Sequence, residues 1–168
     1  MFPLGHVGIG MRMLPARLRE GLPWRWLALG CLLPDAIDKP VYIAVRLARR
    51  LGPVHFELLR GSRLFGHTLF LVALLFASAA LVGSVRMRAL AWGAATHLVL
   101  DLVPDLASGA LVQWRFWLLW PLFGWGFPPQ YTGVAVGGIE VEYVVYLVGD
   151  AIGTALLLRG RNRVVTRG

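Results

Sequence analysis

The sequence predicts an all-α integral membrane protein, a helical bundle with about four spanning helices plus broken or interfacial helices. Three observations predict this fold class. The chain of 168 residues is 57% hydrophobic, with a mean hydropathy of +0.64. Only 15% of its residues are charged, compared with about 25% in a typical soluble domain. The arginines lie at the edges of apolar runs, as residues that flank membrane spans do. We expect one domain over residues 1–168.

The charge and the cysteine content exclude several classes of protein. The formal net charge is +8, and Lys39 is the only lysine among the 17 basic residues. A basic chain can bind nucleic acid, but arginines at the ends of apolar runs favour membrane lipids as partners, and we expect no nucleic acid. Cys31 is the only cysteine, which excludes an internal disulfide and a cysteine-based zinc site. Its apolar neighbours predict a packed thiol.

Three apolar runs are expected to cross the bilayer, at residues 64–85, 89–103 and 139–158. The link Arg86-Met87-Arg88 between the first two is too short for any arrangement but antiparallel neighbours. The start of one helix, with His67, should therefore lie beside the end of the other, with Asp101 and Asp105. We expect Pro104 to end the second helix, because proline has no N–H for the helical ladder.

Other segments are predicted to be broken or interfacial. The run at 24–33 is shorter than the roughly 20 residues that a span needs. Two prolines, Pro34 and Pro40, bracket Asp35 and Asp38, so we expect the helix to break or kink there. Residues 41–63 alternate arginines with apolar residues and predict an amphipathic interfacial segment that includes His55. Tryptophans at 114–125 indicate the membrane–water boundary or, alternatively, a wall of a substrate pocket.

A histidine and two carboxylates interrupt the apolar stretch at 94–105. On a helix His97 and Asp101 lie on one face, with Cβ atoms about 5–6 Å apart, a spacing that suits two ligands of one metal ion. Ionisable groups in apolar spans mark functional sites by default. The chain offers further candidate ligands, so that the full set is His6, Asp35, Asp38, His67, His97 and Asp101.

This set of imidazoles and carboxylates suits zinc, with manganese or iron as alternatives. Six such groups exceed what a four-coordinate structural zinc requires. They can hold one or two ions that activate a water for in-line attack on a phosphoester. No Gly-x-Ser-x-Gly elbow or phosphate-binding glycine loop occurs in the sequence, so serine hydrolase and nucleotide-binding functions lack support.

The order of these motifs resembles the YdjM-type membrane proteins, predicted metal-dependent hydrolases that are distantly similar to zinc-dependent phospholipases C. The matching segments cover roughly residues 1–125: His6, Leu33-Pro34-Asp35-Ala36-Ile37-Asp38, Gly66-His67-Thr68, Thr96-His97-Leu98-Val99-Leu100-Asp101 and Leu119-Trp120-Pro121-Leu122. The resemblance implies a helical fold and a divalent metal. It implies as metal ligands His6, Asp35, His67, His97 and Asp101.

Two further residues take catalytic roles by the same resemblance. Asp38 would be an additional ligand or the residue that positions the water. The family more often reads Thr-His-Ser where this chain has Gly66-His67-Thr68, with an arginine just upstream. Arg63 stands one helical turn before His67 and would take the role of that arginine, holding a phosphate.

The sequence therefore predicts a membrane-bound metal-dependent hydrolase that cleaves a phosphoester of a lipid or lipid-linked substrate. One alternative is a non-catalytic membrane transporter or adaptor whose acidic residues bind ions or pair with arginines. Another is a haem carrier with His67 and His97 as axial ligands. We expect a multi-pass protein of the inner (cytoplasmic) membrane.

The positive-inside bias places Arg86, Arg88 and the arginine-rich C-terminal tail in the cytoplasm. The site is then expected near the extracytoplasmic face. The arginines between 46 and 63 disagree with this orientation unless their segment is interfacial. Glu140, Glu142 and Asp105 fall on the same side as the site, and the sequence leaves open whether they join it.

Overall fold

The computed structural model describes residues 3–52, 59–107, 114–127, 135–136 and 139–165. Within these residues the chain is all-α, as predicted: seven α-helices, one 3₁₀ turn and one hairpin of two very short strands. The helices are α1 (Pro3–Met13), α2 (Ala16–Arg19), α3 (Trp24–Leu51), α4 (Leu69–Val82), α5 (Val85–Ala107), α6 (Trp114–Leu118) and α7 (Val141–Val165). The turn is η1 (Phe65–His67), and the strands are β1 (Ala135–Val136) and β2 (Ile139–Glu140).

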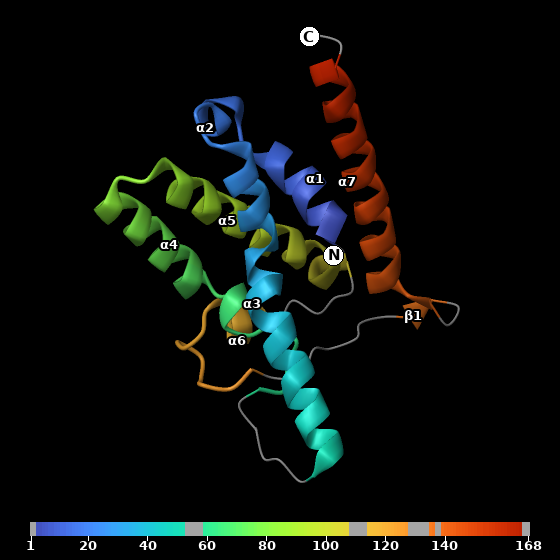
Figure 1. Cartoon of the computed structure of the whole chain (residues 1–168). Helices are drawn as coiled ribbons and strands as arrows, with labels where there is room; N and C mark the ends of the chain where they lie inside the picture. Colours follow the sequence, from blue (N-terminus) through green and yellow to red (C-terminus); the bar gives the residue numbers. More distant parts are fainter. Residues whose placement is uncertain (1–2, 53–58, 108–113, 128–134, 137–138, 166–168) are drawn as a thin grey trace.

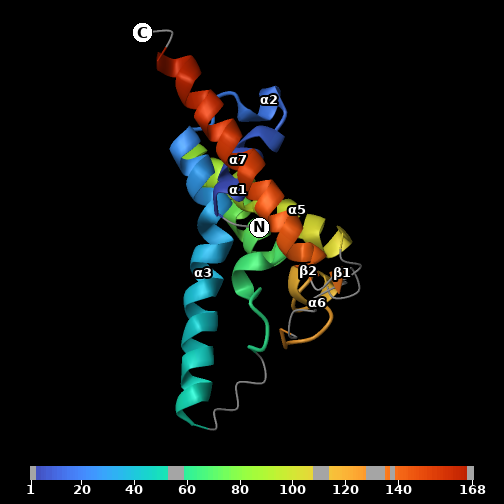
Figure 2. The ribbon, with the colours of Figure 1, turned by 90° about the vertical axis from the view of Figure 1, so that its right-hand side faces the viewer.

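The long helix α3 occupies the centre of the molecule (Figure 1). The helix α4 lies on one side of it and α1 and α7 lie on the other, while α5 crosses α3 and reaches both sides. The second half of α3 projects beyond the other helices in both views (Figures 1 and 2). Glycines permit close packing of α3 on α5, because a Cβ at Gly30 would clash with the carbonyl of Leu90, and one at Gly93 with that of Leu27. The first third of α3 therefore sits tightly on the middle of α5.

One of the described helices is long and apolar enough to cross a bilayer, at Val141–Arg159 in α7. This agrees with the span expected at 139–158. The expected span at 64–85 is wrong in its bounds. Its helix α4 has 14 residues, fewer than the roughly 20 that a span needs. The helix begins at Leu69 because the hydroxyl of Thr68 accepts from the N–H of Leu71 and caps it. A total of about four spans stays a prediction.

The expected break at Pro34 and Pro40 does not occur, because α3 runs without interruption through both. Proline inside a helix costs about 3 kcal/mol or more, so other contacts must hold this turn. Lys39 forms an ion pair with Asp35 four residues earlier, 2.6 Å between Nζ and Oδ2. Asp38 accepts hydrogen bonds from the η1 segment. The runs at 24–33 and 41–51, expected as separate elements, are thus one helix.

The helix α5 likewise continues past Pro104 to Ala107, so the prediction that Pro104 ends it is wrong. Arg63 holds the turn after the proline, because its guanidinium donates to the carbonyl of Asp101 and to the side chain of Asp105. The antiparallel packing of α4 against α5 is as predicted (Figure 1). The reversal uses Gly83, whose φ of 65° favours glycine.

The remaining expectations concern Cys31, His55 and the tryptophans. Cys31 is fully buried, as a packed thiol should be. His55, expected in the interfacial segment, lies outside the described residues. The tryptophans expected at a boundary differ in exposure: Trp117 is buried, Trp114 and Trp120 are partly buried, and 70% of Trp125 is exposed.

Candidate metal centre

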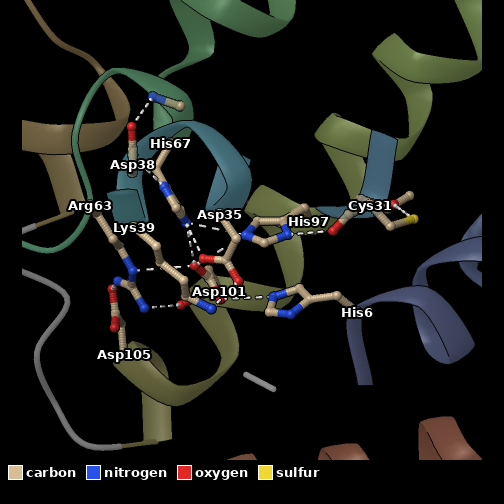
Figure 3. Close-up of polar contacts among 12 residues, drawn as sticks. His6, Cys31, Asp35, Asp38, Lys39, Arg63, His67, His97, Asp101 and Asp105 are labelled. Atoms are coloured by element: carbon tan, nitrogen blue, oxygen red, sulfur yellow. Dashed lines mark hydrogen bonds and ion pairs between the residues drawn. The ribbon is translucent and has the colours of Figure 1, made fainter. Parts of the chain in front are cut away.

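Two histidines, His67 from η1 and His97 from α5, define the middle of the site (Figure 3). The Nδ1 atom of His97 lies 2.7 Å from the carbonyl oxygen of Cys31. A carbonyl only accepts, so Nδ1 carries the proton and the Nε2 atom of the neutral ring presents a lone pair. The Nδ1 atom of His67 lies 2.6 Å from a carboxylate oxygen of Asp38, which fixes the same tautomer. Both Nε2 atoms thus point inwards, 3.1 Å apart.

Asp38 from α3 positions His67. It is fully buried, and it accepts from the N–H groups of Leu64 at 2.6 Å and Gly66 at 2.7 Å as well as from His67. These bonds fix the η1 turn against α3. The tight turn also explains glycine at position 66, because a Cβ there would clash with the carbonyl of Pro34 and lie 2.9 Å from Asp38 Oδ1. Both carboxylate oxygens of Asp38 are therefore in use, and its predicted catalytic role stays a prediction.

Asp101 and His6 complete the inner part of the site. Asp101 Oδ1 lies 3.0 Å from His6 Nε2, and Asp101 Oδ2 lies 3.2 Å from His67 Nε2 and 3.7 Å from His97 Nε2. The rings of His6 and His97 stack with centroids 3.8 Å apart. These groups come from α1, α5 and η1, three elements far apart in the sequence.

Asp35, the fifth predicted ligand, lies at the edge of the site. Its Oδ1 atom is 3.7 Å from His67 Nε2, and 16% of its side chain is exposed. All five predicted ligands thus converge, and their ligand atoms form two groups within 4.8 Å: His6, Asp35 and His97, and His67, His97 and Asp101.

The donor set fits a divalent cation. Two nitrogens bound to one zinc at about 2.0–2.1 Å would lie about 3.0–3.4 Å apart near tetrahedral angles, and the Nε2 atoms of His67 and His97 are 3.1 Å apart. At this separation a positive charge, either a proton that forms a hydrogen bond or a metal ion, lies between the two nitrogens. The same contact leaves no room for a porphyrin between the two rings, so the haem alternative is wrong. The His and Asp groups can hold a metal ion.

Arg63 is buried beside the site, with every part of its guanidinium directed at protein. Its Nη1 lies 2.6 Å from Asp105 Oδ2, its Nη2 lies 3.1 Å from the carbonyl of Asp101, and its Nε lies 3.3 Å from Asp101 Oδ2. The guanidinium carbon also stands 4.7 Å from the ring centroid of Trp117. Burial lowers the pKa of Arg63, but the carboxylates of Asp101 and Asp105 outweigh it and raise the pKa above its usual value. The role of Arg63 in holding a phosphate stays a prediction.

The sequence left open whether several neighbours belong to the site. Asp105 pairs with Arg63, and its position one turn after Asp101 was the signal for it. Trp117 packs beside His67 with ring centroids 6.4 Å apart, so one tryptophan does line the site, as the alternative for that segment proposed. Glu142 is buried and bonded to Tyr146. Among the described residues, the ligand groups include neither Glu140 nor Glu142.

Comparison with known proteins gives a family and no closer relative. A search of curated proteins found no match, and a search of solved structures found none either. The family model described as "YdjM inner membrane protein" matches residues 1–162. This match covers nearly the whole chain, so the protein belongs to the YdjM inner membrane protein family.

Proposed function

We propose that this protein is a membrane-bound metal-dependent hydrolase acting on a phosphoester. The observation that carries the proposal is the convergence of His67 and His97, with Nε2 atoms 3.1 Å apart beside the carboxylate of Asp101. This contact is a hydrogen bond while one of the two Nε2 atoms carries a proton, and both nitrogens become ligands when a cation replaces that proton. The two groups of ligand atoms, each within 4.8 Å, support such a cation.

Each residue of the site would contribute to holding the ion. The five ligands are His6, Asp35, His67, His97 and Asp101. Asp38 and the carbonyl of Cys31 hold the rings of His67 and His97 in the tautomer that leaves Nε2 free to ligate. Three imidazoles favour zinc over manganese. When bound, the ion polarises a phosphoryl oxygen and lowers the pKa of the attacking water.

Three observations support a lipid or lipid-linked substrate. The family is one of inner membrane proteins, and α7 has the length and hydropathy of a span. An apolar pocket of about 490 Å³ also lies on α5 and α6, lined by Val99, Leu102, Val103, Leu106, Trp114 and Leu118. A pocket of this composition suits an acyl or prenyl chain.

The orientation is part of the same proposal. Arg86 at the start of α5 and Arg159 near the end of α7 lie far along their helices from Asp101 and Glu142. The positive-inside bias would place these arginines in the cytoplasm, with the metal centre towards the extracytoplasmic face of a multi-pass protein. The arginines on the projecting end of α3 would then meet the outer lipid head groups.

The test is the metal content of detergent-purified protein, measured by elemental mass spectrometry. We expect one or two equivalents of zinc in the wild type, and none in His97→Ala or in His97→Gln, which keeps a donor for the carbonyl of Cys31. Cys31→Ser alters the neighbouring thiol and should keep its zinc. A wild type without stoichiometric metal after reconstitution would contradict the proposal.

Turnover is the second measurement. Zinc-loaded wild type should hydrolyse bis(p-nitrophenyl) phosphate or a short-chain phospholipid, and both His97 variants should not. A protein that binds zinc but cleaves neither substrate would favour the non-catalytic transporter or adaptor.

A further inference from the structure

The candidate metal centre is closed on most sides and opens at Asp35. The side chains of His97, His67 and His6 are 0%, 1% and 1% exposed. Asp35 is 16% exposed, so a ligand from outside would reach the ion past this carboxylate. Lys39, which touches Asp35, is 51% exposed.

Lys39 therefore lies between the candidate metal centre and the surface of the protein. It lies one turn after Asp35 on α3, with Nζ 2.6 Å from Asp35 Oδ2. The other oxygen of the same carboxylate faces His67. An ion pair of this spacing on an open helix surface contributes little to stability. Here the acidic partner is a candidate metal ligand, so the ammonium lies next to the place where a substrate would bind.

Lys39, the only lysine of the chain, differs from Arg63 in its exposure and in the number of its donors that are directed at protein groups. The guanidinium of Arg63 is buried and directed at Asp105, Asp101 and Trp117. An ammonium has three N–H donors, and in the described part of the chain one of those of Lys39 is directed at Asp35. Lys39 can thus donate outwards without breaking a buried contact. Figure 3 shows Arg63 directed at Asp101 and Asp105, and Lys39 next to Asp35.

We propose that Lys39 binds an anionic oxygen of a phosphate-class ligand at the mouth of the metal centre. The inference rests on the proposed function, and it assigns to Lys39 the phosphate contact that the sequence suggested for Arg63. The ligand chemistry is a phosphate monoester or phosphate dianion, supplied by a lipid head group or as free phosphate.

The experiment compares zinc-loaded wild type, Lys39→Met and Lys39→Arg with the control Arg46→Met. Arg46 stands seven residues after Lys39, on the same face of α3 but about 10 Å further along, with its guanidinium over the ring of Tyr42. Dissociation constants are measured by calorimetry for inorganic phosphate and for dihexanoyl phosphatidic acid. Zinc content is measured for every variant.

We expect Lys39→Met to keep its zinc and to bind phosphate at least about tenfold more weakly, since charge-assisted hydrogen bonds are the strong ones. Lys39→Arg should bind within about threefold of wild type, and Arg46→Met should be unchanged. If Lys39→Met binds both ligands more weakly than wild type does, a lipid phosphate is an acceptable ligand. If the variant binds only inorganic phosphate more weakly, the ligand is free phosphate.

Three outcomes would overturn the inference, and they separate it from the proposed function. Wild-type phosphate affinity in Lys39→Met would mean that the lysine is only a surface ion pair. Loss of zinc in Lys39→Met would mean that it only positions Asp35. A wild type that binds zinc but no phosphate would remove the anion site and leave the metal centre intact, whereas a wild type without zinc removes both.

Discussion

Asp101 and Asp105 stand one turn apart on the same face of α5, and both are buried. Their partners differ. Asp105 forms a close pair with Arg63, 2.6 Å between Oδ2 and Nη1. Asp101 receives a longer contact of 3.3 Å from the Nε of the same arginine. Its two oxygens otherwise face the imidazoles of His6 and His67.

The difference lies in how the negative charge of each buried carboxylate is balanced. Burying a carboxylate costs free energy unless a positive charge is paired with it. The permanently charged Arg63 supplies this positive charge for Asp105. Asp101 has only the longer contact with Arg63, and its other close neighbours are the imidazoles of His6 and His67. Arg63 balances the charge of Asp105, whereas we propose that a cation shared with the imidazoles helps to balance that of Asp101.

Replacing the two carboxylates one at a time should give the largest effects on zinc affinity and on stability. Asp101→Asn removes the charged ligand and keeps the size of the side chain, so we expect zinc affinity to fall by more than about a hundredfold. Asp105→Asn should leave zinc affinity within about threefold and lower the free energy of unfolding by about 3 kcal/mol, because Arg63 loses its closest partner. Zinc affinity is measured by competition with a chelating indicator, and stability by thermal unfolding in detergent.

The two variants serve as controls for each other, since they alter the same helix face one turn apart. Equal loss of zinc in both would show that Asp105 belongs to the metal centre. Equal loss of stability with zinc retained would show that Asp101 is also only a partner of Arg63.

The positioning of His67 by Asp38 should have the next largest effect. In Asp38→Asn one oxygen becomes an NH₂ group, which cannot accept, so either Gly66 or Leu64 together with His67 loses its acceptor. The η1 turn should then hold His67 less well, and we expect zinc affinity to fall about ten- to a hundredfold. The measurement is again competition with a chelating indicator.

Glu142→Gln provides the matched control, because Glu142 is also buried but lies outside the ligand groups. It should keep wild-type affinity. An unchanged affinity in Asp38→Asn would contradict the positioning role, and a complete loss of zinc would instead support Asp38 as a ligand.

Local spacing predicted the inner part of the site. His97 and Asp101 share a helix face because they are four residues apart, and the short link after α4 brings His67 beside them. These are consequences of helix geometry and chain connectivity, and both can be worked out without tertiary contacts.

Tertiary contacts determine the continuity of the helices at their prolines and the direction of Arg63, which the sequence did not predict. Pro34 predicted a break or kink and Pro104 a helix end, but contacts with distant segments hold both helices: Asp38 of α3 accepts from η1, and Arg63 donates to α5. The direction of Arg63 is set in the same way. Its charge and its distance from His67 in sequence are compatible with a phosphate site, and only the position of Asp105 in space turns the guanidinium inwards.

The weakest predicted effect concerns the way α7 holds the ligand His6. Asp150 of α7 accepts from the N–H of Gly5 at 2.7 Å, in the first turn of α1 and next to His6 in sequence. Gly8 and Gly153 allow the two helices to touch, since a Cβ on either would clash with the backbone of the other helix. Asp150→Asn replaces a charged acceptor by a neutral one, worth about 1 kcal/mol, so we expect zinc affinity to fall about fivefold or less.

Ile152→Ala, at an exposed position of the same helix, is the control for Asp150→Asn and should bind zinc like the wild type. Unchanged affinity in Asp150→Asn would mean that the bond between His6 and Asp101 fixes α1 by itself. A loss as large as that expected for Asp38→Asn would mean that α7 controls the site as strongly as the carboxylate that orients His67. The small effect follows if His6 is held twice, once by Asp101 within the site and once by α7 behind it.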